Sequence, residues 1–351
     1  MQQAVKFIHV QYEAELIGCI LPFHFKNVYF CSSILSFNIM EVYLAPMQGL
    51  TDWIFRESFY EHIGQFDKAF APFIRVQNGD FYHPSQCNDI VPAHNTFQKP
   101  VPQFLGNDGA SFKRFEELCL EHGYTEANIN LGCPFIKVTS KGMGAGILPH
   151  PDKVAGLLES VFSNTKLKVS VKCRLGQEHA AEFEQLIPVF NDFPIEEMII
   201  HPRIGKQMYK GEVDLEAFAR YAPQLKHSIC YNGDIVKIAD VRKIEEIMPG
   251  ISKIMIGRGI LQNPFLLAEI RNQEVSKTEK VSRLRAFHVS LIERCKEKYS
   301  GDLNLLRRLE ELWSYHAEGF EDGRKIFKQV KKCNTLAKYE VVLFKVINEL
   351  I

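Results

Sequence analysis

Residues 197–201 read Glu-Met-Ile-Ile-His, a short apolar run that ends in a polar residue. A run without alternation suits a strand that is covered on both faces, as in a parallel sheet. Seven similar runs occur elsewhere in the chain, so that eight strands are expected. They are Val42–Ala45, Lys68–Phe73, Val101–Leu105, Ala127–Leu131, Lys168–Lys172, Glu197–His201, Ser228–Asn232 and Lys253–Gly257.

Amphipathic patterns of helical period lie between and after these runs. They cover Asp52–His62, Gly109–His122, Asp152–Val161, Ala180–Asn191, Leu215–Tyr221, Val236–Ile247 and Leu261–Ile270. This alternation predicts the α/β class and a closed (β/α)8 TIM barrel. A doubly wound open sheet is the alternative, but no Gly-x-Gly-x-x-Gly motif follows the first strand.

The strand signal ends near Glu274, and helices are expected over Glu279–Tyr299, Leu303–Gly319 and from Gly323 to the end. We therefore expect a barrel of residues 40–275 and a small C-terminal helical domain of residues 276–351. Residues 1–39 show neither helical nor strand periodicity. We interpret them as a non-native or disordered N-terminal extension, with the native start at Met40; an ordinary extra segment is the alternative.

Composition restricts the partners that the chain can have. Lys plus Arg and Asp plus Glu both number 42, so any nucleic-acid surface has to be a local cluster of charge. The nine cysteines include no Cys-x-x-Cys pair, which disfavours a zinc ribbon or disulfide framework and indicates a cytoplasmic protein without a metal. No apolar run is long enough to cross a membrane.

The active site of such a barrel forms at the carboxyl ends of the strands. Loops after the seventh and eighth strands commonly bind phosphate there, and here they carry Asn232–Asp234 and Gly257–Gly259, with Arg258 able to grip a phosphate. Lys172 is expected to face the mouth, where a buried ammonium needs an anionic partner. Gln103 offers both a donor and an acceptor to a flat heterocycle.

Cys133 follows the fourth strand between Gly132 and Pro134. Buried cysteines usually fill the core, but this one belongs to the mouth of the barrel. No histidine adjoins it in the sequence, which disfavours a protease-like nucleophile. A thiol with a pKa of about 8.5 stays protonated at neutral pH and suits a general acid.

Residues 324–338 read RKIFKQVKKCNTLAK, with six basic residues and no acidic one. On a helix, Arg324, Lys328, Lys331 and Lys332 would fall largely on one side. That side could neutralise RNA phosphates, although a merely solvated face would show the same pattern.

Taken in order, these motifs resemble the tRNA-dihydrouridine synthase family. The resemblance covers about residues 41 to 270, with a looser match in the helical tail. It rests on LAPMQGLTD at 44–52 with Phe55 and Arg56, NINLGCP at 128–134, KGMGAG at 141–146, VSVKCRLG at 169–176, IHPR at 200–203, YKG at 209–211, YNGDI at 231–235 and IGRG at 256–259. Pro202 and residues 204–206 depart from the family pattern, which leaves the subgroup and the target position open.

The resemblance implies that the enzyme reduces uridines in tRNA through FMN, with NADPH or NADH as reductant, and that Cys133 donates the proton. Residues implied to hold the uridine or nearby phosphates are Asn130, Arg75 and Tyr209, and Arg308, Lys328, Lys331 and Lys332 are expected to contact tRNA. The residues implied to bind FMN are Pro46, Met47, Gln48, Gln103, Lys172, His201, Asn232, Gly233, Asp234, Gly257 and Arg258.

Two other functions fit part of the sequence. An FMN barrel oxidoreductase acting on a small molecule, similar to dihydroorotate dehydrogenase, would have the same strand ends but no use for the basic tail. An RNA-binding module without catalysis would have no use for Cys133, Lys172 and Arg258. Nothing in the sequence requires a dimer, so a monomer is expected, and no motif says which uridine is reduced.

Overall fold

The computed structural model describes residues 40–77, 80–81 and 83–348, so the expectation for residues 1–39 lies outside the described residues. Its strands are β1 (Glu41–Leu44), β2 (Lys68–Ala69), β3 (Ile74–Gln77), β4 (Asp80–Phe81), β5 (Gln103–Leu105), β6 (Glu126–Leu131), β7 (Lys168–Gly176), β8 (Glu197–Ile204), β9 (Ser228–Asn232) and β10 (Lys253–Ile256). Its helices are α1 (Trp53–His62), α2 (Gly109–Glu121), α3 (Ile136–Thr139), α4 (Pro151–Phe162), α5 (Glu182–Asn191), α6 (Leu215–Tyr221), α7 (Ile238–Ile247), α8 (Arg258–Gln262), α9 (Leu266–Ile270), α10 (Lys277–Lys298), α11 (Asp302–His316), α12 (Gly323–Val330) and α13 (Leu336–Asn348).

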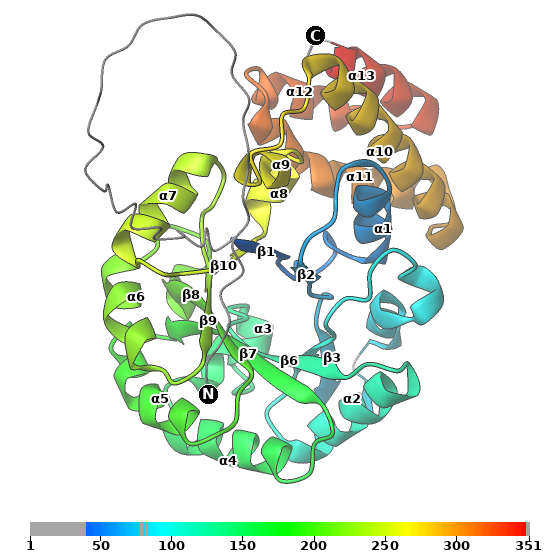
Figure 1. Ribbon diagram of the computed structural model, residues 1–351. Helices are drawn as coiled ribbons and strands as arrows, with labels where there is room; N and C mark the ends of the chain where they lie inside the picture. Colours follow the sequence, from blue (N-terminus) through cyan, green and yellow to red (C-terminus); the bar gives the residue numbers. More distant parts are fainter. Residues whose placement is uncertain (1–39, 78–79, 82, 349–351) are drawn as a thin grey trace, which may run out of the picture. The chain divides into compact units, whose positions relative to one another are not determined.

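The strands form a closed parallel barrel, which confirms the predicted fold class. β1 pairs with β10 on one side and β2 on the other, and the order continues through β9, β8, β7 and β6 to β5. β3 pairs in parallel with β5, and the short β4 is antiparallel to β3. The ring closes because Phe70, just after β2, pairs in parallel with Val101, just before β5. Figure 1 shows the barrel helices α2 and α4 to α7 around the outside of this ring.

Alternation along each strand divides side chains between the barrel interior and the surrounding helices. A separate interior cluster contains Tyr43, Phe70, Ile199, Cys230 and Met255, together with Ala45 and Val101. The neighbouring residues of each strand belong to the larger core beneath the helices. A side chain two positions beyond a member of this interior cluster, toward the carboxyl end of its strand, therefore points into the mouth of the barrel.

Three expected elements differ from the structure. The expected strand Lys68–Phe73 is interrupted after β2 and resumes as β3, because Pro72 has no N–H to donate to the ladder. The expected helix Leu261–Ile270 is two helices, α8 and α9, separated at Pro264. The expected helix from Gly323 to the end breaks before α13, where the Thr335 hydroxyl accepts from the Lys338 N–H at 3.4 Å.

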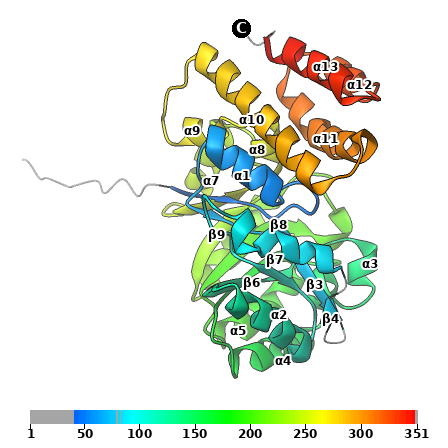
Figure 2. The same cartoon turned by 90° about the vertical axis from the view of Figure 1, so that its right-hand side faces the viewer.

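The C-terminal helices pack against the barrel at α1, as Figure 2 shows. Phe287 of α10 meets the rings of Phe55 and Phe59 edge-on, and Arg283 donates to the carbonyl of His62 at 2.9 Å. The division at residues 275 and 276 falls in the connection between α9 and α10 and stays a prediction. Within the described ranges, every helix is too short or too polar to span a bilayer.

Candidate functional site

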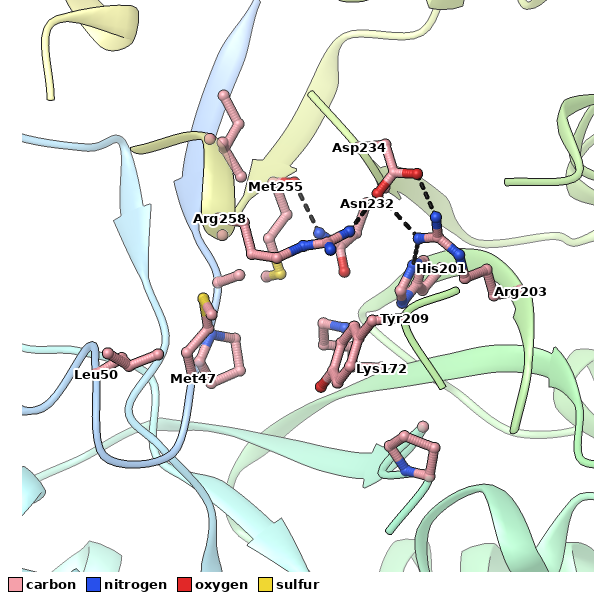
Figure 3. Close-up of a pocket in the computed structure, with 18 of the residues that line it drawn as sticks. Met47, Leu50, Lys172, His201, Arg203, Tyr209, Asn232, Asp234, Met255 and Arg258 are labelled. Atoms are coloured by element: carbon pink, nitrogen blue, oxygen red, sulfur yellow. Dashed lines mark hydrogen bonds and ion pairs between the residues drawn. The ribbon is translucent and has the colours of Figure 1, made fainter. Parts of the chain in front are cut away.

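A pocket of about 520 Å³ opens at the carboxyl ends of the barrel strands. This volume is typical of sites for small molecules and cofactors. Its lining includes Met47 from the loop after β1, Cys133 from the loop after β6, Lys172 from β7 and Arg258 from α8. Figure 3 shows side chains from several strands converging on this space.

Strand periodicity explains why the polar side chains point into the pocket. His201 stands two residues beyond Ile199, and Asn232 stands two residues beyond Cys230, both of which belong to the interior cluster. Residues i and i+2 of a strand share a face. The polar member of each pair therefore lies directly above the apolar one, between the barrel interior and the pocket. Gly257 has the same relation to Met255, and all three residues line the pocket.

A chain of charged and polar groups crosses one side of the pocket. Arg203 donates to Asp234 Oδ1 at 2.9 Å and to His201 Nε2 at 3.0 Å. Arg258 reaches the same Asp234 oxygen at 2.5 Å. Figure 3 shows the order Arg258, Asp234, Arg203, His201. Asp234 therefore orients two guanidinium groups, one of which, Arg203, is almost fully buried.

Two donors of the pocket have no acceptor among the described residues. A guanidinium can only donate, so the contact with Arg203 makes His201 Nε2 the acceptor and places the proton on Nδ1. Burial, with Arg174 and Lys172 adding to it, holds the pKa of His201 well below its ordinary value, so the ring is neutral. Lys172 makes no ion pair within the described chain, and burial, with Arg174 adding to it, lowers its pKa to about 8. Both groups call for an acceptor-rich ligand.

Two glycines leave room for such a ligand to approach the backbone. A Cβ on Gly233 would lie 2.9 Å from Val213 Cγ1, and one on Gly257 would lie 3.1 Å from Met47 Sδ. In the described part of the chain, the backbone N–H groups of Gly233, Asp234, Gly257 and Arg258 have no backbone acceptor. This arrangement resembles the phosphate cradles of other barrels.

Cys133 lies at the pocket wall and is 6% exposed. Its backbone carbonyl accepts from the Ala145 N–H at 3.0 Å, and a Cβ on Gly144 would lie 2.6 Å from that carbonyl oxygen. Burial raises the pKa of the Cys133 thiol, although the Phe135 N–H and nearby cations oppose the effect. The thiol is therefore protonated at neutral pH.

A buried amide network supports the Cys133 loop. Asn130 Oδ1 accepts from the N–H groups of Gly132 at 3.0 Å and Cys133 at 2.9 Å, while Asn130 Nδ2 donates to Gln103 Oε1 at 2.8 Å. Gln103 Nε2 in turn donates to Asn128 Oδ1 at 2.8 Å. Asn130 lines the pocket, but Gln103 is fully buried and lies outside the lining. A direct contact between Gln103 and a cofactor stays a prediction.

Of the other predicted site residues, most line the pocket but Arg75 does not. Tyr209 lines the pocket, with its ring 5.4 Å from the guanidinium carbon of Arg174 and 5.5 Å from that of Arg258. Arg75 is buried on β3, outside the lining, and donates to Gln77 at 2.8 Å. The predicted cofactor residues in the lining are Pro46, Met47, Gln48, Lys172, His201, Asn232, Gly233, Asp234, Gly257 and Arg258.

The residues of the helical part that were expected to contact tRNA differ in their exposure to solvent. Lys328, Lys331 and Lys332 are all exposed, and Lys331 lies 3.6 Å from Glu310. Arg308 is only 5% exposed and donates to the carbonyl of Leu50 at 2.7 Å. The expectation that Arg308 contacts tRNA does not fit this placement, because its guanidinium is directed into the protein.

Several lining residues received no binding role from the sequence, although Arg174 and Arg203 stand at expected strand ends. Arg203 and Arg174 had a usable signal, because each follows an assigned inward residue by two positions on its strand. Glu311 and Tyr315 of α11 and Phe135 beside Cys133 had none. The charged lining thus holds four basic side chains, Lys172, Arg174, Arg203 and Arg258, against the carboxylates of Asp234 and Glu311.

The donor set fits a flat anionic cofactor with a phosphate, such as FMN. Lys172 and His201 supply unpaired donors, and the two glycine loops with Arg258 supply a phosphate cradle. No group of three or more His, Cys, Asp or Glu side chains among the described residues is placed to hold a metal ion.

Comparison with known proteins gives a consistent result. The sequence profile of a family described as Dihydrouridine synthase (Dus) matches residues 43–347, which include the barrel and the helical part. A "Probable tRNA-dihydrouridine synthase" of Staphylococcus aureus (strain COL) is 27% identical over 310 residues, covering 86% of this chain and 91% of that protein. The "tRNA-dihydrouridine synthase B" of Pasteurella multocida is 27% identical, covering 82% and 81%. A "Probable tRNA-dihydrouridine synthase" of Rhodobacter capsulatus is 30% identical, covering 65% and 70%.

Proposed function

The chain belongs to the dihydrouridine synthase family, and we propose that it reduces the C5–C6 double bond of a uridine in tRNA. The observation that carries this proposal is the position of a protonated thiol, Cys133, in the same pocket as the unpaired ammonium of Lys172. A small-molecule oxidoreductase would not account for the family match over both parts of the chain. An inactive RNA-binding module would have no use for Cys133, Lys172 and Arg258, which all line the pocket.

FMN is the proposed cofactor and would supply the hydride for uracil C6, renewed by NADPH or NADH. Lys172 and the Nδ1–H of His201 would bind the acceptor-rich edge of its ring, and the ammonium would stabilise negative charge there. Arg258, oriented by Asp234, would bind the phosphate with the backbone N–H groups of Gly233 and Gly257. Met47, Pro46, Gln48 and Asn232 complete the lining on the cofactor side.

Cys133 would deliver the proton to C5 of the uracil. Its raised pKa keeps the proton on sulfur until carbon accepts it, and the Asn130 carboxamide holds the loop in place. Asn130 is thus proposed as a positioning residue for Cys133 as well as a contact for the uridine. Tyr209, beside the guanidinium groups of Arg174 and Arg258, is proposed to contact the nucleotide at the mouth.

The tRNA would contact the exposed lysines of α12 and the turn after it, Lys328, Lys331 and Lys332. Arg75 stays a proposed contact for a phosphate near the uridine. We also propose a cytoplasmic monomer without a metal, a location that suits the seven free cysteines of the described chain and a tRNA substrate.

Purified protein tests the function directly. We expect yellow protein whose flavin NADPH reduces, whose reoxidation under anaerobic conditions requires unmodified tRNA, and whose product contains dihydrouridine. NADPH oxidation with a small acceptor and none with tRNA would favour the small-molecule oxidoreductase. Colourless protein that still binds tRNA, even after incubation with FMN, would favour the binding module.

A further inference from the structure

Two large apolar side chains stand in solvent beside Cys133. Phe135 is 48% exposed and Ile136 is 79% exposed, although both follow the buried pair Cys133 and Pro134 directly. Phe135 also lines the pocket, so the exposed pair continues the pocket wall outward. Two adjacent exposed apolar side chains at the rim of a site are typical of a contact surface for a partner.

Folding of the loop does not require this pair. Val138, two residues further on, is the member that packs into the cluster of Cys133, Leu105 and Met143. The carbonyl of Phe135 accepts from the N–H groups of Val138 at 2.8 Å and Thr139 at 3.0 Å, whatever the side chain at 135. The loop is therefore held by its backbone and by Val138, and it presents Phe135 and Ile136 outward in a fixed position.

The charges around the pair indicate which partner it meets. Lys137 of α3 and Lys141 shortly after it are exposed, and the 134–142 segment contains no acidic residue. Apolar and aromatic side chains between lysines suit stacked bases flanked by phosphates. A bilayer or a protein partner has no such reason to meet the rim of this particular pocket.

The depth of the pocket adds the geometrical reason. Cys133 is 6% exposed, so a uracil ring can reach its sulfur only after leaving the base stack of the RNA completely. Extrusion removes stacking from the neighbouring bases as well as from the uridine. An apolar surface at the rim can replace the stacking that those neighbours lose.

We propose that Phe135 and Ile136 form a wedge that packs against the bases next to the target uridine and stabilises its extruded state. This inference rests on the proposed function, because it names how the same site gains access to its base. The wedge acts on the substrate and takes no part in flavin reduction or proton transfer.

The test uses flavin-loaded full-length protein and a tRNA with 2-aminopurine next to a uridine that the wild type reduces. Binding of the wild type should raise the 2-aminopurine fluorescence, because a stacked base is replaced by phenyl and aliphatic side chains, which quench the probe less than a base does. Phe135→Ser/Ile136→Ser should abolish most of this rise and lower kcat/KM for tRNA about tenfold, equivalent to about 1.4 kcal/mol. Ile136→Ser alone, at the more exposed position, should give part of both effects.

Leu120→Ser is the matched control, because Leu120 is 39% exposed on α2, near the end that leads to the amino end of β6. It should behave as wild type, and NADPH reduction of the flavin should be normal in all variants. An undiminished fluorescence rise in both wedge variants, or no rise with the wild type, would overturn the proposal. A wedge variant that only loses self-association would assign the pair to contacts between copies. Failure of the wild type to reduce any tRNA would refute the proposed function instead.

Discussion

Arg308 of α11 donates to Asp52 Oδ1 at 3.1 Å, and both side chains are only 4% exposed. Asp52 also caps α1 by accepting from the Phe55 N–H at 3.2 Å, and Lys298 lies 3.2 Å from its other oxygen. Burial acts to raise the pKa of Asp52, but Arg308 and Lys298 hold it below its ordinary value. This buried cluster joins the helical part to the loop that carries Met47 and Leu50 into the pocket.

Replacing Arg308 by methionine should therefore destabilise the fold as well as the pocket. Removing one partner of a buried ion pair costs about 3 kcal/mol, because the carboxylate of Asp52 loses its principal counter-charge. Urea unfolding at pH 7 measures the loss. Asp52 has a depressed pKa in the wild-type fold, and burial should raise that pKa once Arg308 is gone. The difference from wild type should therefore be full at neutral pH and shrink as the pH falls and the variant's Asp52 becomes protonated.

Arg307→Met is the matched control, because Arg307 is the exposed neighbour on the same helix. Its effect should stay within about 0.5 kcal/mol. Equal stability of both variants and the wild type would show that the cluster does not join the two parts.

The lowered pKa of Lys172 predicts that flavin retention depends on pH. Burial, with Arg174 adding to it, lowers the pKa of Lys172 to about 8, so the ammonium is present below that pH and is lost above it. Flavin affinity should fall as the pH rises through about 8, by roughly ten- to hundredfold for a charge-assisted contact. Flavin fluorescence after rapid dilution, followed from pH 6 to 10, measures this.

Lys172→Met should show weak retention and a flat profile over the same range. Arg258→Ala should weaken retention at every pH, since a guanidinium stays charged throughout. If wild type and Lys172→Met had the same profile, Lys172 would not face the cofactor.

Cys133→Ala separates a chemical role from a packing role. Flavin content and NADPH-driven flavin reduction should be nearly normal, because the thiol takes part only after hydride transfer to the uracil. Reoxidation of the reduced flavin by tRNA should slow by about 10²–10⁴-fold, the contribution of a positioned general acid. Rapid mixing of pre-reduced enzyme with unmodified tRNA measures this step. A wild-type rate together with a lower melting temperature would reduce Cys133 to its place in the cluster with Leu105, Val138 and Met143.

Charge reversal of Lys328, Lys331 and Lys332 to Glu should raise the KM for tRNA. The slope of log affinity against log salt should decrease by up to about 2–3, at roughly 0.7–0.9 for each phosphate that a lysine no longer neutralises. Filter binding at several salt concentrations measures it, and NADPH reduction of the flavin should not change.

A second triple variant, Lys113→Glu/Lys166→Glu/Lys226→Glu, changes the net charge equally at exposed sites. Lys166 and Lys226 precede β7 and β9, at the end of the barrel away from the pocket. This variant should keep most of the affinity and the full salt slope. An equal loss in both triple variants would indicate a general effect of net charge.

The local sequence was sufficient to predict the barrel and many of the residues that line its mouth. Strand period and strand ends are local properties, so His201, Asn232 and Gly257 could be placed at the pocket two positions beyond their interior partners. The loop of Cys133 could be placed by the same reasoning, because it follows β6 directly.

Only the tertiary structure determined which residues of the C-terminal helices pack near these strand ends. Whether a basic residue is buried or solvated depends on the surface that its helix packs against, so the sequence pattern could not separate buried Arg308 from exposed Lys328. Glu311 and Tyr315 enter the pocket only because α11 lies beside the loop of Gly49, where a Cβ would come within 3.6 Å of the Glu311 carboxylate. Contacts across more than 250 residues of chain follow from packing of whole helices, which leaves no periodic signal in either segment.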